Sequence, residues 1–229
     1  MKKLTGVADV VATMAAFCAQ VEAFMDEVDR QFREQAPELS KVKIVVRNVV
    51  DDCDTAGAGW VYIAQSYSIE IKAGRKSRYV SFIVELTTAR VVDAGLQEDI
   101  KSPLVHVVIG PDPVGFTAGK HWIITIPPSA SSDGTDHVAL EDDGKAWVWR
   151  GNETDRTTPF DFLRDALLYS YSLEVFTGPN AIANLLITPL VYVLNGAKLE
   201  SALAVIPVLT YREVNDAETS QRSYRLISN

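Results

Sequence analysis

The sequence predicts an α+β protein in which a long N-terminal helix packs on an antiparallel sheet of five or more strands. Apolar residues recur at every third or fourth position from Leu4 to Phe32, which is the period of an α-helix. Residues 60–73 and 78–88 instead alternate between apolar and polar side chains, which is the period of strands that are covered on one face. A further segment, residues 158–178, has the apolar pattern and the end signals of a second helix.

The N-terminal helix carries an apolar stripe that is wider than the seam of a two-stranded coiled coil. The stripe consists of Leu4, Val7, Val11, Met14, Cys18, Val21, Met25, Val28 and Phe32, with Val10, Phe17 and Phe24 beside them. This width favours packing on the chain's own sheet, with a helical bundle or a dimer seam as the alternative. Because the first half is rich in alanine and the second half is charged, we expect the N-terminal half to be enclosed more completely.

The first three predicted strands are residues 42–50, 60–73 and 78–88, and a turn at residues 74–77 joins the last two. One face of the middle strand is polar, and we expect solvent to cover it. The residues of this face are Ser66, Ser68, Glu70 and Lys72.

Two further strands are predicted at residues 104–109 and 121–126, separated by a loop of Gly, Pro and Asp. If these strands are neighbours, His106 and His121 lie diagonally on one face. A metal or catalytic site would need a third ligand, and the chain contains no His-x-His or Glu-x-x-His spacing. We therefore predict no metal site and no cofactor.

The clearest hairpin signal is Asp143-Gly144, a dipeptide that favours a two-residue turn. This turn pairs Leu140 with Trp147 and Val138 with Trp149, so that both Trp residues share a face.

The predicted helix at residues 158–178 begins with a Thr-Pro pair and ends at a Gly-Pro pair. It is apolar on two sides, so we expect it to be buried or shared with a second subunit. Beyond it, residues 213–229 are polar and are expected to form a loose tail of one domain that spans residues 1–229.

Composition narrows the class of function. The chain has 229 residues, 47% hydrophobic and 23% charged, with a formal net charge of −8, which are values of an acidic globular protein. An excess of acidic residues makes nucleic acid an unlikely partner. Two cysteines in unrelated contexts indicate a reducing, cytoplasmic location. The most apolar later segment, residues 182–194, contains Asn and Pro and is too short for a membrane span.

The alternative of a metal-dependent enzyme has four candidate catalytic residues: Asp51, Asp52, Glu70 and Lys72. An acidic residue followed by Glu-x-Lys on the next strand resembles the pattern of metal-dependent nucleases, in which carboxylates hold a divalent ion and Lys positions the attacking water. The same spacing arises on any exposed strand, and this is the interpretation that we favour. It predicts that Glu70 and Lys72 are both exposed and that neither Asp lies beside Glu70.

Two groups of residues are candidates for binding. The predicted turn between the two long strands carries the densest positive cluster of the chain, Lys72, Arg75, Lys76 and Arg78. Such a cluster can contact an acidic partner or a phosphate, but more often it keeps a hairpin tip soluble and prevents it from pairing with other strands, and this is the interpretation that we favour. The other group is Trp147 and Trp149, which with Trp60 and Phe82 would line a small-molecule pocket between the helix and the sheet.

The leading hypothesis is a cytosolic, non-enzymatic interaction or assembly subunit, whose partner is another protein or a second copy of the chain. It rests on the surplus of amphipathic helical surface and on the lack of a catalytic motif. One alternative is a metal-dependent hydrolase or nuclease, and a second is a small-molecule-binding protein.

Overall fold

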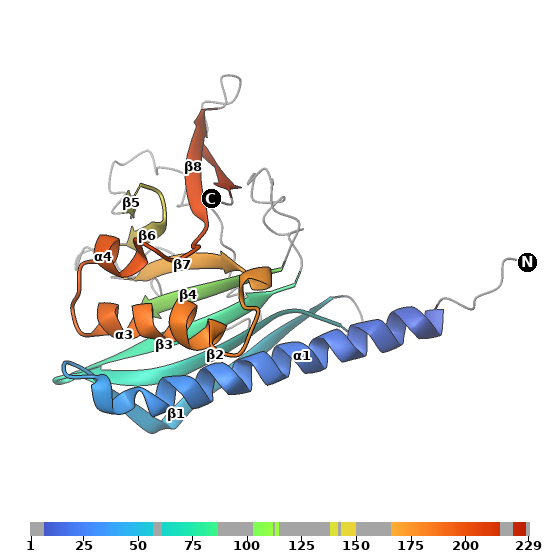
Figure 1. Ribbon diagram of the computed structural model, residues 1–229, viewed down its shortest axis with the longest axis horizontal. Helices are drawn as coiled ribbons and strands as arrows, with labels where there is room; N and C mark the ends of the chain where they lie inside the picture. The colour runs from blue at the N-terminus through green and yellow to red at the C-terminus, as the bar shows by residue number, and fades with distance from the viewer. Residues whose placement is uncertain are drawn as a thin grey trace, which may run out of the picture.

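A computed structural model describes residues 7–56, 61–86, 103–111, 113–114, 138–141, 143–149, 166–215 and 222–227. It confirms the α+β class, with a long N-terminal helix lying on an antiparallel sheet (Figure 1). The helix, α1, runs from Val7 to Glu34 and is followed by a short 3-10 turn, η1, at Ala36–Glu38.

Within the described residues, seven antiparallel strands form the main sheet in the spatial order β1-β2-β3-β4-β7-β6-β5. Their bounds are Lys43–Ala56 (β1), Val61–Ala73 (β2), Lys76–Glu85 (β3), Leu104–Gly110 (β4), Val138–Glu141 (β5), Ala146–Trp149 (β6) and Leu167–Ser172 (β7). A separate two-stranded sheet pairs β8, Thr210–Asn215, with β9, Arg222–Ile227. The order shows that β4 has β3 and β7 as its two neighbours, so it does not pair with residues 121–126, the arrangement that would have brought His106 and His121 together. Residues 121–126 lie outside the described residues.

The hydrophobic core lies between one face of the sheet and a layer of helices. In Figure 1 α1 crosses this face below the π-helical turn η4, Ile182–Ile187, and the helices α3, Thr188–Leu194, and α4, Leu199–Leu203. Phe32 of α1 meets Phe82 of β3 with ring centroids 6.0 Å apart, and Phe24 meets Phe176 at 5.3 Å. Val80, Val105 and Tyr169 contribute to the same core from successive strands. Every second side chain of β3 and β4 therefore packs in the core that these helices cover.

The hairpin at Asp143-Gly144 is confirmed. Both residues have positive φ angles, 53° and 89°, as a tight two-residue turn between antiparallel strands requires. The register pairs Val138 with Trp149 and Leu140 with Trp147, as predicted.

The second helix predicted at residues 158–178 is wrong over its C-terminal half. Leu167–Ser172 is a strand in the middle of the sheet and Leu173–Val175 is a 3-10 turn, whereas residues 158–165 lie outside the described part of the chain. The segment Leu-Leu-Tyr-Ser-Tyr-Ser alternates, with Tyr169 and Tyr171 in the helix-facing core and Ser170 on the other face. Apolar residues on two sides reflect a strand buried on both faces, for which the helical period is a poor guide.

The expected loose tail is also wrong for residues 213–215 and 222–227, which belong to the hairpin of β8 and β9. Polar side chains do not prevent pairing when an antiparallel neighbour satisfies the backbone.

Burial along α1 is the reverse of what we expected. Val21, Met25, Val28 and Phe32 are buried, which confirms the apolar stripe over the C-terminal half. The side chains described between Ala12 and Gln20 are exposed or half-buried. In Figure 1 this N-terminal half extends past the strands and past η4. The alanine-rich composition of the first half therefore did not indicate which half of α1 the sheet and the other helices cover. Of the helices in the described ranges, none combines the length and the apolar character needed to cross a membrane.

Candidate functional site

The face of the sheet opposite the helices is buried from Ser66 to Glu70 along β2, although its polar residues predicted a solvent-exposed surface. Ser66 and Ser68 have no exposed area and Glu70 is 4% exposed, so the expectation for Glu70 is wrong. These residues form internal hydrogen bonds. Ser66 Oγ donates to the carbonyl of Val114 at 2.9 Å, Ser68 Oγ lies 2.8 Å from Ser81 Oγ, and Ser77 Oγ donates to Glu70 Oε1. A strand with polar residues at every second position can turn them toward solvent or toward internal hydrogen-bond partners, and the sequence pattern is the same in both cases.

A chain of four polar side chains crosses the centre of this buried face. His106 Nε2 lies 3.3 Å from Glu85 Oε2, and His106 Nδ1 is hydrogen-bonded to Ser170 Oγ at 2.7 Å. Ser170 Oγ is in turn 2.6 Å from the hydroxyl of Tyr211. The residues come from β3, β4, β7 and β8, and the direct pairing of His106 with Ser170 places two of them side by side. Burial raises the pKa of Tyr211, so its hydroxyl stays neutral.

Glu85, His106 and Ser170 follow the order carboxylate, imidazole, hydroxyl of a catalytic triad, in which the imidazole activates the serine as a nucleophile. Here, however, Ser170 and His106 have no exposed area, so no substrate can reach the hydroxyl in this conformation. The observed geometry instead connects β8 to the sheet through Tyr211, whose backbone N–H also donates to the carbonyl of Gly144 at 2.8 Å. Sequence analysis missed this cluster because Glu85, His106 and Ser170 come together only when the strand order is known.

We expect Ser170→Ala to lower the free energy of unfolding by about 1–3 kcal/mol, because it removes the shared partner of His106 Nδ1 and the Tyr211 hydroxyl. Urea unfolding measures this change. Ser201→Ala, at an exposed position of α4, is the control and should stay within about 0.5 kcal/mol of the wild type. Equal effects of the two substitutions would contradict a structural role for the buried chain.

The strand register does not gather the nuclease-like residues. Asp51 pairs with Tyr67, three positions from Glu70 on β2, so Asp51 and Glu70 lie on opposite faces of the sheet. Asp52 pairs with Ser66, which is four positions or about 13 Å along the strand from Glu70. Lys72 is exposed, as expected. Within the described ranges, no three His, Cys, Asp or Glu residues are grouped so as to hold a metal ion.

The small-molecule pocket predicted between helix and sheet is not formed around Phe82. Phe82 has no exposed area and packs edge-on against Phe32. Trp147 pairs with Leu168 of β7, but the side chains of Trp147 and Trp149, like all of Trp60, lie outside what the structure describes.

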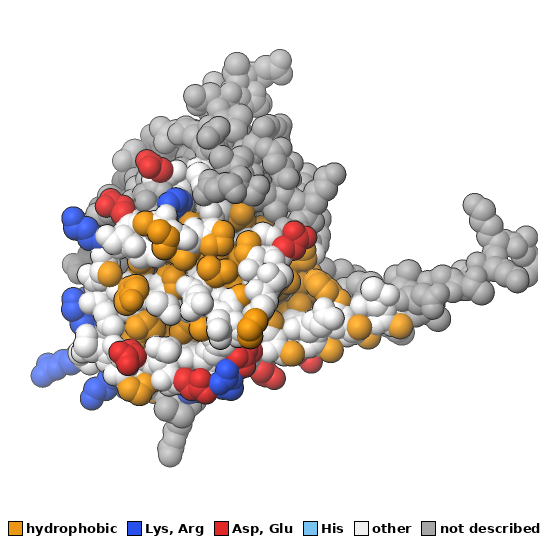
Figure 2. Space-filling model, viewed as in Figure 1, with side chains coloured by type: hydrophobic (Ala, Val, Ile, Leu, Met, Phe, Trp, Pro, Cys, Tyr) orange, Lys and Arg blue, Asp and Glu red, His pale blue; other side chains and the backbone are white. Residues whose placement is uncertain are grey.

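The predicted basic cluster lies at one end of the molecule. Lys72, Arg75 and Lys76 are exposed and Arg78 is half-buried, around a turn at Gly74-Arg75 that is shorter than the predicted one. Lys and Arg side chains gather along the left edge of Figure 2, near the end that contains this turn. β1 begins at the same end, since Lys43 pairs with Lys72.

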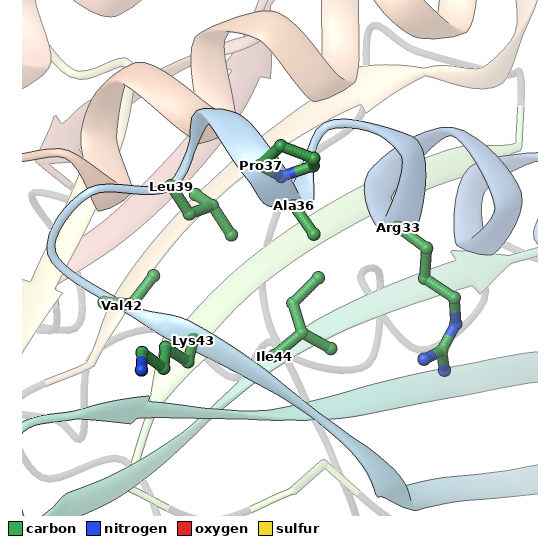
Figure 3. Close-up of a pocket in the computed structure, with 7 residues that line it drawn as sticks. All are labelled: Arg33, Ala36, Pro37, Leu39, Val42, Lys43 and Ile44. Atoms are coloured by element: carbon green, nitrogen blue, oxygen red, sulfur yellow. The ribbon is translucent and has the colours of Figure 1, made fainter.

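An open hollow of about 590 Å³ lies beside this end, between the C-terminus of α1 and the start of β1 (Figure 3). Its lining residues are Arg33, Ala36, Pro37, Leu39, Val42, Lys43 and Ile44. The lining is therefore mostly apolar, with two basic residues. Arg33 is already engaged, because its Nε donates to Asp29 Oδ1 at 2.7 Å.

No protein-family model, curated protein or solved structure matches this chain.

Proposed function

We propose that the protein is a non-enzymatic assembly subunit that associates through the N-terminal half of α1. The observation that carries this proposal is a helical segment without charge that the body of the molecule leaves largely uncovered. Residues 10–21 contain no Asp, Glu, Lys or Arg. Ala12, Ala16 and Ala19 are exposed, and Phe17 and Cys18 are only half-buried.

Two physical arguments support this interpretation. A helix that is apolar or uncharged on all sides is normally enclosed by other elements. Moreover, isolated helices of this length are marginal in water, so the projecting half needs tertiary or quaternary contacts to remain helical. A partner that packs on residues 10–20 would enclose the uncharged segment and would supply the contacts that keep it helical.

The simplest partner is a second copy of the chain. Each copy presents the same uncharged surface, and a two-fold axis would place the two segments against each other. The earlier expectation that the helix at residues 158–178 supplies the interface does not apply to its C-terminal half, which is strand β7. The N-terminal half of α1 takes its place as the proposed surface.

We expect sedimentation velocity to show a mass above that of one chain, rising from low to high micromolar concentration. Ala16→Glu should shift the equilibrium toward the monomer, because it introduces a charge into the proposed interface. Ala23→Glu is the matched control, since Ala23 is also exposed on α1 but lies in the half that packs on the sheet.

A wild-type protein that stays monomeric over this range would contradict self-association. An equal loss of association in both variants would contradict the assignment to the N-terminal half of the helix.

A further inference from the structure

The basic end of the molecule combines positive charge with an adjacent apolar hollow. We propose that this end binds a short acidic segment of another protein, anchored by one apolar side chain of that segment in the hollow. This surface is separate from the N-terminal half of α1. The two proposals can therefore fail independently.

Folding brings together bases that are distant in the sequence. Lys43 at the start of β1 pairs directly with Lys72 near the end of β2, and both are exposed. Lys41, Arg75 and Lys76 are exposed at the same end. None of these five forms an ion pair with another residue of the described ranges. Like charges directly opposite each other on antiparallel strands are destabilising, and a bound carboxylate would relieve this repulsion.

Lys43 also lines the hollow, so the apolar and basic surfaces are continuous. The apolar side of the hollow is formed by Ala36, Leu39, Val42 and Ile44, which point into it in Figure 3. A volume of about 590 Å³ is ample for one large apolar side chain. Interfaces of this kind take most of their affinity from a buried anchor, whereas surrounding charges add specificity and speed of association.

The charge of the whole chain favours a short acidic segment over an extended polyanion. With a net charge of −8, the protein as a whole repels a long phosphate polymer or an anionic membrane. A nucleic acid or membrane site would need a longer basic track, and it would have no use for an apolar hollow of side-chain size.

Fluorescence anisotropy with a fluorescein-labelled peptide containing one Leu followed by a run of Glu tests the proposal. We expect saturable binding that weakens as salt is added. Lys43→Gln combined with Lys72→Gln should weaken it by about tenfold or more. Asn180→Asp combined with Asn184→Asp changes the net charge by the same amount at exposed positions in η4 and in the turn before it, and should leave binding within about twofold of the wild type.

Two altered peptides separate the contributions of anchor and charge: replacing Leu by Ser should weaken binding through the hollow, and replacing Glu by Gln should abolish its salt dependence. No binding of the original peptide would overturn the proposal, as would equal binding of the Gln peptide. Tighter binding of oligothymidylate or of vesicles rich in phosphatidylserine would assign the surface to nucleic acid or membrane instead. The Lys43→Gln, Lys72→Gln variant should still self-associate in sedimentation velocity. A negative result in the peptide-binding experiment would therefore not contradict self-association through α1.

Discussion

Replacing Val21 with Asp should lower the free energy of unfolding by about 3–5 kcal/mol, because the new carboxylate would be buried without a partner. Val21 is 3% exposed and belongs to the core between α1 and the sheet. It is also the first fully buried position described along the helix. Urea unfolding with an unchanged m-value measures the effect as a shift of the midpoint.

Ala23→Asp is the control for the Val21 variant. It introduces the same charge two residues away on an exposed side of α1, and should change stability by less than about 1 kcal/mol. Near-wild-type stability of Val21→Asp would show that the C-terminal half of α1 does not pack on the sheet.

Replacing Gly144 with Ala should lower the free energy of unfolding by about 3 kcal/mol, the sum of backbone strain and a lost hydrogen bond. Gly144 has a φ of 89°, which an L residue adopts only with strain. In addition, a Cβ at this position would overlap the carbonyl oxygen of Tyr211, so β8 would have to move away from the hairpin. That movement would break the bond from Tyr211 N–H to the Gly144 carbonyl.

Gly178→Ala separates the two effects. Gly178 has a φ of 92°, but nothing lies within 4 Å of a Cβ added there. It should therefore show only the backbone strain, about 1–2 kcal/mol. Equal stability losses for the two alanine variants would contradict the close approach of β8 to the Asp143-Gly144 turn.

The elements that the sequence predicted correctly are those whose signals are local. The stripe of α1 and the Asp143-Gly144 turn depend on spacing within one segment, over four heptads in the first case and at one dipeptide in the second. The helix prediction failed at residues 167–172 because this strand is covered on both faces. Its apolar residues continue the helical spacing of the preceding segment, and the short alternation of Tyr and Ser is too brief to outweigh it.

The buried face of the sheet could not be predicted because it depends on strand order. In the sequence, Glu85 resembles an ordinary polar residue on the exposed face of a strand, and Ser170 falls within the segment predicted to be a helix. Only the β3-β4-β7 order places them on either side of His106, and only β8 brings Tyr211 to the cluster. For the basic end, the sequence supplied Lys72 and its neighbours on the hairpin, but the pairing of β1 with β2 was needed to add Lys43.

The central claim is that α1 has two halves, one packed on the sheet and one that forms an interface between molecules. Hydrogen–deuterium exchange of α1 at low and high protein concentration tests it most directly. We predict that amides of residues 21–34 are protected equally at both concentrations, whereas protection of residues 10–20 rises with concentration. Exchange in residues 10–20 that is the same at every concentration would contradict the proposed interface.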